Sequence, residues 1–247
     1  MYWIRDRTEK FWSDERAAQK WYYGTKWLPL TEEEIAGIEL GYKVKFSPEH
    51  REFLKILHAV DRKETVEYEY NEEKFSEECT FFYHWQEDRE EILEIITYPY
   101  DSMLKDIESA ETRWLKSWGP EPGSEEKRKA IFYQWFARVP DLLPLRGIHF
   151  MVSSEHLTRN PVLCISGFDM NILGWDMKTY LLGELRDYIG IVDTVFDEED
   201  RMYYPELNRE ARDIIEKNFQ HDETKDIPYL KEVILYYSSG HRDFGLK

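Results

Sequence analysis

The stretch NPVLCISGFDMNILGWDMKTYLL, residues 160–182, decides the fold class. It contains two short apolar segments, PVLCIS and MNIL, which we interpret as strands joined by the turn GFD. So short a connection predicts antiparallel pairing, because parallel strands need a long crossover. A helix is predicted to follow directly, over residues 175–188. This close mixture of paired strands and helices indicates an α+β protein.

The segments on either side of this stretch extend the same pattern. Apolar spacing and capping residues predict helices over 8–23, 31–42, 47–57, 101–118, 124–137, 205–219 and 227–237. Alternating or dense apolar residues predict further strands over 65–70, 79–85 and 148–152. The polar segment 71–78 and the proline-rich segment 139–147 are interpreted as loops.

Two helix starts have specific signatures. Thr31 followed three residues later by Glu34 is a capping box, in which each side chain binds a backbone N–H of the other residue. Ser47 followed by Pro48 places a capping hydroxyl before a proline at the first helical position, where no N–H is needed. Gly41 suits the end of the first of these helices.

The sequence predicts one main domain with an appendage. Residues 1–190 are expected to form a single α+β domain with a mainly antiparallel sheet flanked by helices. Residues 191–247 are expected to form a helical C-terminal extension packed on this core. The acidic segment DTVFDEEDR, residues 193–201, marks the seam between the two.

Composition limits the classes of function. The formal net charge is −17, which disfavours direct binding to nucleic acid and to anionic membranes because both would repel the surface. The two cysteines make no disulfide framework, and neither a secretory leader nor a long apolar run is evident. We therefore expect a cytoplasmic protein, and we make no prediction of its oligomeric state.

The sequence contains no recognisable motif for catalysis or cofactor binding. The glycine-rich phosphate loops and the GxSxG nucleophile pattern are missing. His149, His156, Cys164 and Asp169 form a loose group whose spacing matches no metal-ligand pattern. Cys164 lies in an apolar strand, which would raise the thiol pKa, so we interpret it as a small buried side chain. Asp169 is expected to hold the adjacent turn, and no catalytic residue, metal or cofactor is predicted.

Acidic residues gather in two runs. Residues 67–78 contain six Glu against one Lys, and residues 86–94 contain five acids against one Arg. The runs flank the apolar segment 79–85, so both are expected near the ends of one strand. Such density suits the capture of a basic protein, although an acidic surface can also serve solubility alone. The candidate partner-binding residues are Glu67, Glu69, Glu72, Glu73, Glu77, Glu78, Glu87, Asp88, Glu90 and Glu91.

Several segments, taken in order, resemble the SUKH superfamily. The segments are WLPLTEEEIAGIELGYKVKFSPEHREFLKIL (27–57), FYHWQEDREEI (82–92), WLKSWGPEP (114–122), VPDLLPLRGIHF (139–150) and NPVLCISGFDMNILGWDMKTYL (160–181). Together they cover roughly residues 27–188. RGIHF stands where the family has a Gly-His-Arg-Phe order, and the tail after about residue 190 lies outside the resemblance.

The resemblance implies a single α+β domain without a common catalytic residue set. Many bacterial members are immunity proteins that bind and neutralise toxins, often nucleases, and fungal relatives are scaffolds. We therefore expect a non-enzymatic module that binds a basic toxin domain. The alternatives are a regulatory or scaffold module with a host protein partner, and an aromatic-rich glycan binder or hydrolase with paired carboxylates.

Overall fold

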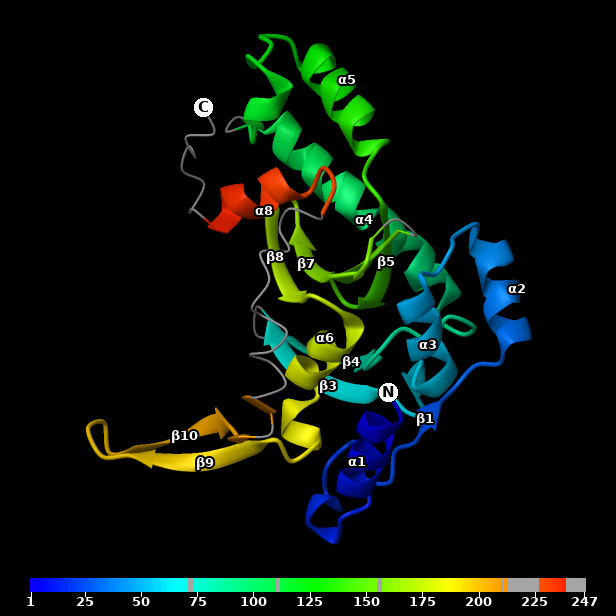
Figure 1. Cartoon of the computed structure of the whole chain (residues 1–247), viewed down its shortest axis with the longest axis vertical. Coiled ribbons are helices and arrows are strands. Elements are labelled where there is room, and N and C mark those ends of the chain that lie inside the picture. The colour runs from blue at the N-terminus through cyan, green and yellow to red at the C-terminus, as the bar shows by residue number, and fades with distance from the viewer. Residues whose placement is uncertain (71–72, 110–111, 155–156, 210, 213–226, 239–247) are drawn as a thin grey trace.

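The computed structural model describes residues 1–70, 73–109, 112–154, 157–209, 211–212 and 227–238 (Figure 1). Its centre is a four-stranded antiparallel sheet in the order β5-β6-β7-β8. The strands are β5 (Asp141–Arg146), β6 (His149–Ser153), β7 (Val162–Ser166) and β8 (Asp169–Gly174). The predicted hairpin over residues 160–174 is confirmed, and so is the α+β class.

β5 corrects one prediction, because residues 139–147 were expected to be a loop. The strand contains Pro144, which has no N–H to donate to a ladder. β5 lies at the edge of the sheet and its pairing with β6 is irregular between Pro144 and Arg146. An edge position is where a strand tolerates proline.

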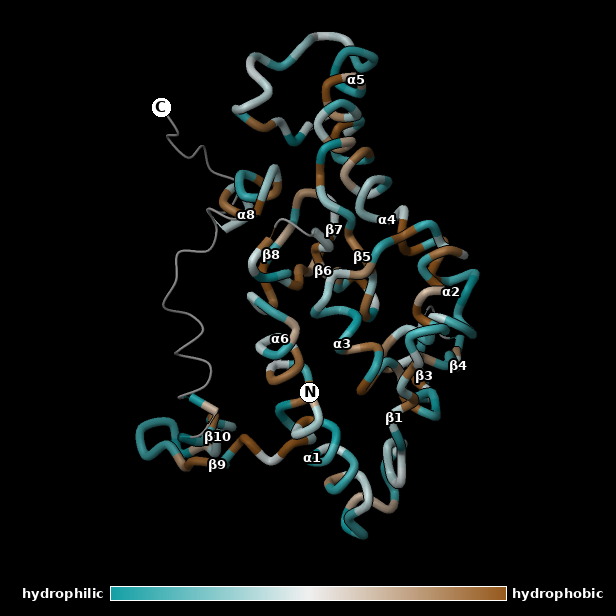
Figure 2. Tube along the Cα trace, turned by 45° about the vertical axis from the view of Figure 1, so that its right-hand side comes forward, coloured by the Kyte–Doolittle hydropathy of each residue, from teal (hydrophilic) through white to brown (hydrophobic). Residues whose placement is uncertain are grey.

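Both faces of this sheet are buried. On one face Leu143, Met151 and Val162 join a hydrophobic cluster with residues of α3 (Pro48–Ile56) and α6 (Met177–Glu184). On the other face Phe150, Leu163 and their neighbours join a cluster with three helices. These are α4 (Arg89–Glu108), α5 (Glu125–Phe136) and α8 (Lys231–Ser238). Hydrophobic residues accordingly gather around β5–β8 in Figure 2. Among the described residues no helix is long and apolar enough to cross a membrane.

The N-terminal helices carry the predicted caps. In α2 (Glu32–Tyr42) the Thr31 hydroxyl accepts the N–H of Glu34, and the Glu34 carboxylate accepts the N–H of Thr31. In α3 the Ser47 hydroxyl accepts the N–H of His50. Both predicted helix starts are therefore confirmed. The end of α2 differs from the prediction, because Lys43 rather than a glycine adopts the left-handed conformation, with φ of 57°.

The helix predicted over residues 8–23 is wrong in its bounds. α1 spans Tyr2–Trp12, and a separate 3-10 turn, η1 (Glu15–Ala17), follows it. The Asp14 carboxylate starts that turn by accepting the N–H of Arg16 at 2.9 Å. The short strand β1 (Trp27–Leu28) precedes α2 in the chain, and β2 (Ala59–Val60) follows α3. The two strands pair with each other in an antiparallel manner.

The segment 79–85 is not the inner strand that its composition predicts. β3 (Glu64–Tyr70) was predicted, but its partner is β4 (Glu73–Cys79), within the segment 71–78 that we interpreted as a loop. Beyond Cys79 the chain leaves the ladder. The N–H of Tyr83 donates to the carbonyl of Leu145 at 2.9 Å. The buried aromatic residues there are Phe81, Phe82, Tyr83 and Trp85.

The helix predicted over residues 101–118 is also misplaced. α4 begins at Arg89 and ends at Glu108, and it contains Pro99. Residues 116–118 form the separate 3-10 turn η2 (Lys116–Trp118). The helix predicted over 124–137 is confirmed as α5, with the Ser124 hydroxyl accepting the N–H of Lys127.

The C-terminal extension begins with strands, not with a helix. β9 (Val192–Asp197) and β10 (Met202–Leu207) form an antiparallel hairpin, so the helix predicted from residue 205 is wrong for 205–207. Residues 209, 211 and 212 of that predicted helix are helical, and residues 210 and 213–219 lie outside the described residues. The last predicted helix is present as α8 but begins at Lys231 instead of residue 227. It packs against β8 through residues such as Val233 and Ile234. Between the sheet and this hairpin lies the 3-10 turn η3 (Arg186–Tyr188).

Candidate functional site

The β3–β4 hairpin carries most of the predicted partner-binding residues. Within the described residues it pairs with no other strand and forms a sheet of its own (Figure 1). Its residues are exposed along both strands, and only Glu64 and Cys79 at its base are half-buried. A two-stranded hairpin with no packed face is marginally stable at best. The hairpin therefore contributes little to the core.

The two faces of this hairpin differ in chemistry. Strand residues alternate between faces, so the register places Glu67, Glu69 and Glu78 on one side with Lys74. The opposite side carries exposed apolar side chains together with Glu73 and Glu77. These apolar residues are Val66, Tyr68, Tyr70 and Phe75.

Tyr68 and Phe75 organise the apolar side. They lie directly opposite each other across the two strands, with ring centroids 5.5 Å apart and planes inclined by 18°. Such a stacked pair contributes roughly 0.5–1.5 kcal/mol beyond the area it covers. The stack therefore stabilises the hairpin while leaving both rings accessible.

Asp88 differs from the other candidate residues because its side chain is inside the fold. The carboxylate is 4% exposed, accepts the N–H of His84 at 2.8 Å and pairs with the ammonium of Lys63 at 2.9 Å. This ion pair raises the pKa of Lys63. Asp88 thus ties the base of β3 to the start of α4, and its oxygens already have partners.

The two acidic runs meet at the base of the hairpin. Burial is the main cause that raises the pKa of Glu91, and the negative charges of Asp88 and Glu77 add to it while Lys63 opposes them. Glu77 of the first run therefore lies close enough to influence Glu91 of the second. Glu87 and Glu90 are exposed beside it.

The structure thus places nine of the ten candidate residues. Eight are exposed, and five of these lie on the hairpin, namely Glu67, Glu69, Glu73, Glu77 and Glu78. The other three, Glu87, Glu90 and Glu91, lie at the start of α4 and in the turn before it. Asp88 is buried, and Glu72 lies outside the described residues.

A second exposed hairpin was missed by the sequence analysis. β9 and β10 also form a two-stranded sheet with no further partner among the described residues. Phe196 and Tyr203 lie opposite each other with ring centroids 5.0 Å apart and are 47% and 69% exposed. The alternation of Val192, Thr194 and Phe196 is the sequence signal that indicates a strand there. The DEED segment, residues 197–200, ends β9 and forms the turn.

One cluster in the central sheet contains the residue types that nucleophilic chemistry uses. His149 lies opposite Cys164 in the ladder, and its Nδ1 atom is 3.0 Å from the hydroxyl of Tyr180. The carboxylate of Glu184 pairs with Arg146 at 2.8 Å nearby. Burial raises the pKa of the Cys164 thiol and lowers that of His149, which favours the neutral form of both groups. A nucleophilic cysteine needs the opposite shift.

Asp169, a further member of the predicted loose group, does not join this cluster. Asp169 is exposed in β8, and the turn beside it is held by Asp106, whose carboxylate accepts the N–H of Phe168 at 2.8 Å. His156 lies outside the described residues. Within the part of the chain that the structure describes, no three His, Cys, Asp or Glu side chains converge as a metal site would require.

Comparisons with models of protein families, with curated proteins and with solved structures find no match to this chain. The resemblance to the SUKH superfamily therefore depends on the quoted motifs alone. The function has to be inferred from the surface of the molecule, and above all from the exposed β3–β4 hairpin.

Proposed function

We propose that this chain is a non-enzymatic binding module that captures a basic protein through its acidic β3–β4 hairpin. We further propose that it acts as an immunity-type protein, so that the partner is a basic toxin domain such as a nuclease. The observation that carries the proposal is the free-standing hairpin, which has carboxylates on both faces and stacked, exposed aromatic rings on one of them.

The acidic face supports fast and selective encounter. Glu67, Glu69 and Glu78 share this face with one lysine, in a chain of net charge −17. A field of this sign accelerates association with a basic partner and repels acidic ones. Nucleic acid is repelled for the same reason.

The aromatic face supports a lasting complex. Tyrosine and phenylalanine are enriched at protein interfaces, where a rigid ring contributes a large contact area. A cluster of exposed apolar residues on an otherwise polar surface marks an interaction site. Tyr68, Tyr70 and Phe75 form such a cluster, with Glu73 and Glu77 beside it. The same face can therefore supply both apolar contact and charge.

The test is recovery of the partner with matched charge variants. The whole tagged chain is used to capture proteins from its native source, which are eluted with high salt and identified by mass spectrometry. The hairpin variant Glu67→Lys, Glu69→Lys, Glu78→Lys is compared with a control, Glu15→Lys, Glu33→Lys, Glu52→Lys. The control residues are exposed and lie outside the hairpin, so both variants have the same net charge.

We expect a basic protein that the wild type and the control recover and the hairpin variant loses. With that protein purified, the hairpin variant should associate more slowly and with a weaker dependence on salt. An immunity role further requires that the partner arrests growth alone and that co-expression of this chain restores it. Equal recovery by the two variants would remove the hairpin from the interface, and a partner without toxicity would favour the regulatory or scaffold alternative.

A further inference from the structure

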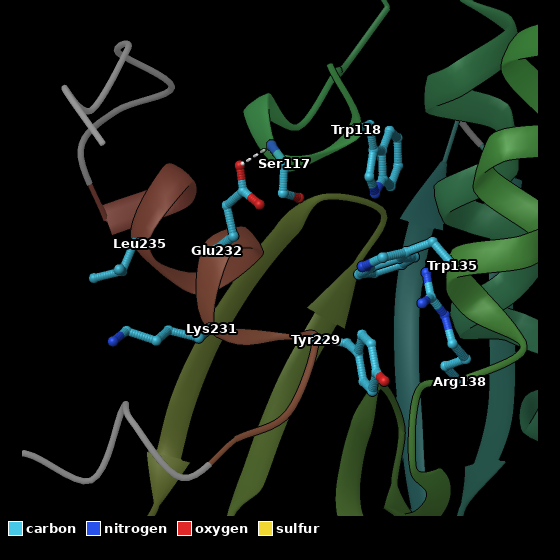
Figure 3. A pocket seen from close by; sticks show the side chains of 8 residues that line it. All are labelled: Ser117, Trp118, Trp135, Arg138, Tyr229, Lys231, Glu232 and Leu235. Carbon is cyan, nitrogen blue, oxygen red and sulfur yellow. Dashed lines mark hydrogen bonds between the residues drawn. The ribbon is translucent and has the colours of Figure 1, made fainter. Parts of the chain in front are cut away.

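A cavity of about 470 Å³ lies between η2, the end of α5 and the start of α8 (Figure 3). Its size is within the range of small-molecule sites. None of the acidic candidate residues lines it. The lining residues are Ser117, Trp118, Trp135, Arg138, Tyr229, Lys231, Glu232 and Leu235.

Trp135 presents a hydrogen-bond donor to this cavity without an acceptor. The residue is 4% exposed, and Figure 3 shows its indole nitrogen directed into the open space. No described residue accepts that N–H. The indole N–H of Trp118, which lines the same cavity, is buried and also has no partner in the described part of the chain. Buried tryptophan N–H groups usually have one, so the cavity, as far as the described residues form it, lacks an acceptor for these two donors.

Arg138 adds a positive charge beside Trp135. Its Nε atom donates to the carbonyl of Gln134 at 3.2 Å, and its guanidinium lies 5.2 Å from the centre of the Tyr229 ring. Among the described residues no carboxylate pairs with it, although the chain has 50 acidic residues against 33 basic ones. Lys231 also lines the cavity, but its ammonium is directed away from Trp135 and Arg138 (Figure 3). The Arg138 end of the cavity is thus positively charged in an acidic protein.

Tyr229 is held in an uncommon backbone conformation that brings its ring to the cavity. Its φ is 66°, and the N–H of Leu230 donates to the carbonyl of Pro228 at 2.8 Å, which closes a tight turn on Tyr229. A γ-turn with positive φ is rare and strained, and such strain concentrates at ligand sites. Figure 3 shows the ring below Trp135, facing the same space.

Glu232 makes the cavity asymmetric. Its carboxylate accepts the N–H of Ser117 at 3.2 Å, on the side away from Arg138 (Figure 3). An anionic group is therefore repelled at the Glu232 side and attracted at the Arg138 side. The polar groups define an orientation, while Trp118, Trp135 and Tyr229 supply aromatic surface.

We propose that this cavity binds a small aromatic carboxylate. The carboxylate accepts from the indole N–H of Trp135 and the guanidinium of Arg138, and the aromatic ring packs among the three aromatic side chains. Charge-assisted bonds to arginine fix the anionic end, because they are stronger than neutral ones. This site is independent of the partner-binding hairpin, since it shares no residue with it.

The test uses 1-naphthoate and the full chain, followed by the indole N–H signals in nuclear magnetic resonance spectra. The chain has nine tryptophans, and the signal of Trp135 is assigned by its loss in Trp135→Phe. We expect a saturable shift of this signal. Neutral 1-naphthalenemethanol and cationic 1-naphthylmethylammonium should bind at least about tenfold more weakly, because each lacks the anion that the arginine recognises. Cyclohexanecarboxylate should also bind more weakly, because it cannot stack.

Three variants connect the binding to the geometry. Arg138→Gln should lower the affinity for 1-naphthoate by about tenfold, because the substitution removes the guanidinium. Since the side chain is exposed, the core should stay intact. Arg16→Gln is the control and should change nothing, since Arg16 is exposed and pairs with Asp14 instead. Glu232→Gln should strengthen binding by removing a repulsive charge. Tighter binding of the ammonium probe than of 1-naphthoate, or no shift of the Trp135 signal with any probe, would overturn the proposal.

Discussion

The Nε2 atom of His58 lies 3.0 Å from the backbone nitrogen of Trp85 and accepts its hydrogen bond. The Nδ1 atom of the same ring lies 2.9 Å from the carbonyl oxygen of Leu28. Because the first nitrogen must accept, the second carries the proton and donates to Leu28, so the ring is neutral. His58 therefore provides a partner for the backbone of the segment 79–85, where no strand ladder does.

The first prediction concerns stability in acid. Burial lowers the pKa of His58 to about 4 from 6.5, and burial lowers that of the fully buried His50 to about 3. Below pH 6.5 these two histidines bind a proton in the unfolded chain but stay neutral in the folded chain. The free energy of unfolding therefore falls as the pH falls toward 4. For His58 the loss reaches about 3 kcal/mol. Urea titrations at pH 7.5, 6 and 5 measure it.

His58→Asn separates this effect from general acid sensitivity. Asparagine tolerates the left-handed backbone of residue 58, whose φ is 62°. Its shorter side chain cannot bridge Trp85 and Leu28, so we expect a loss of about 2 kcal/mol at pH 7.5. The difference between variant and wild type should shrink at pH 5, because the variant has no imidazole to protonate. A constant difference across this range would mean that His58 does not cause the acid sensitivity.

Glu49 gives a prediction of opposite sign. Burial is the main cause that raises its pKa to about 7 from 4.5, and the negative charge of Asp176 adds to the shift. The carboxyl group lies against α6, where it accepts the N–H of Met177 at 3.0 Å. Between pH 4.5 and 7 the folded state holds a proton that the unfolded state has lost, so this group stabilises the fold at low pH and loses that contribution as pH rises through 7.

Glu49→Gln removes this titration while keeping an oxygen for Met177. From pH 5 to pH 8 the stability of the variant relative to wild type should rise by about 2–3 kcal/mol. The measurement is a pair of chemical denaturation curves at each pH. Glu33→Gln, at an exposed position in α2, is the control and should give no such change. An unchanged difference between pH 5 and pH 8 would show that Glu49 is ionised throughout.

The features that the sequence predicted correctly depend on neighbouring residues. The caps at Thr31 and Ser47 each form within three residues, and the hairpin of β7 and β8 turns within two. Local chemistry therefore determines them. Residues 73–78 were wrongly predicted to be a loop because β4 has no buried face, so it lacks the alternation that a half-buried strand shows.

The errors elsewhere come from distant contacts. The apolar segment 79–85 is held in the core by packing and by hydrogen bonds to His58 and Leu145. The spacing of apolar residues within the segment does not indicate these distant partners. The charge of the candidate surface could be read from composition, but the burial of Asp88 could not, because Lys63 reaches it from 25 residues away. The Trp135 cavity likewise joins three segments that are far apart in the chain.

Asp88 and Glu87 offer a matched test of which acids are structural. Asp88→Asn should lower the free energy of unfolding by about 2 kcal/mol, because it leaves Lys63 and the N–H of His84 competing for one oxygen. The neighbouring Glu87→Gln should leave stability unchanged, since that carboxylate is 74% exposed. Thermal and urea denaturation of both variants measure the difference. Equal stability of the two variants would contradict the internal role of the Lys63–Asp88 pair.

Two glycines give the last prediction, because substitution by alanine should act on them in opposite directions. A Cβ atom at Gly174, the end of β8, would lie 2.5 Å from the backbone nitrogen of Tyr180, so strand and helix α6 would have to separate. We expect Gly174→Ala to destabilise by about 2–3 kcal/mol. At Gly183, inside α6, a Cβ meets nothing within 4 Å, and alanine should stabilise the helix by up to about 1 kcal/mol. Denaturation curves of both variants measure the change in the free energy of unfolding. If Gly174→Ala leaves that free energy unchanged, β8 and α6 are not held this close in solution.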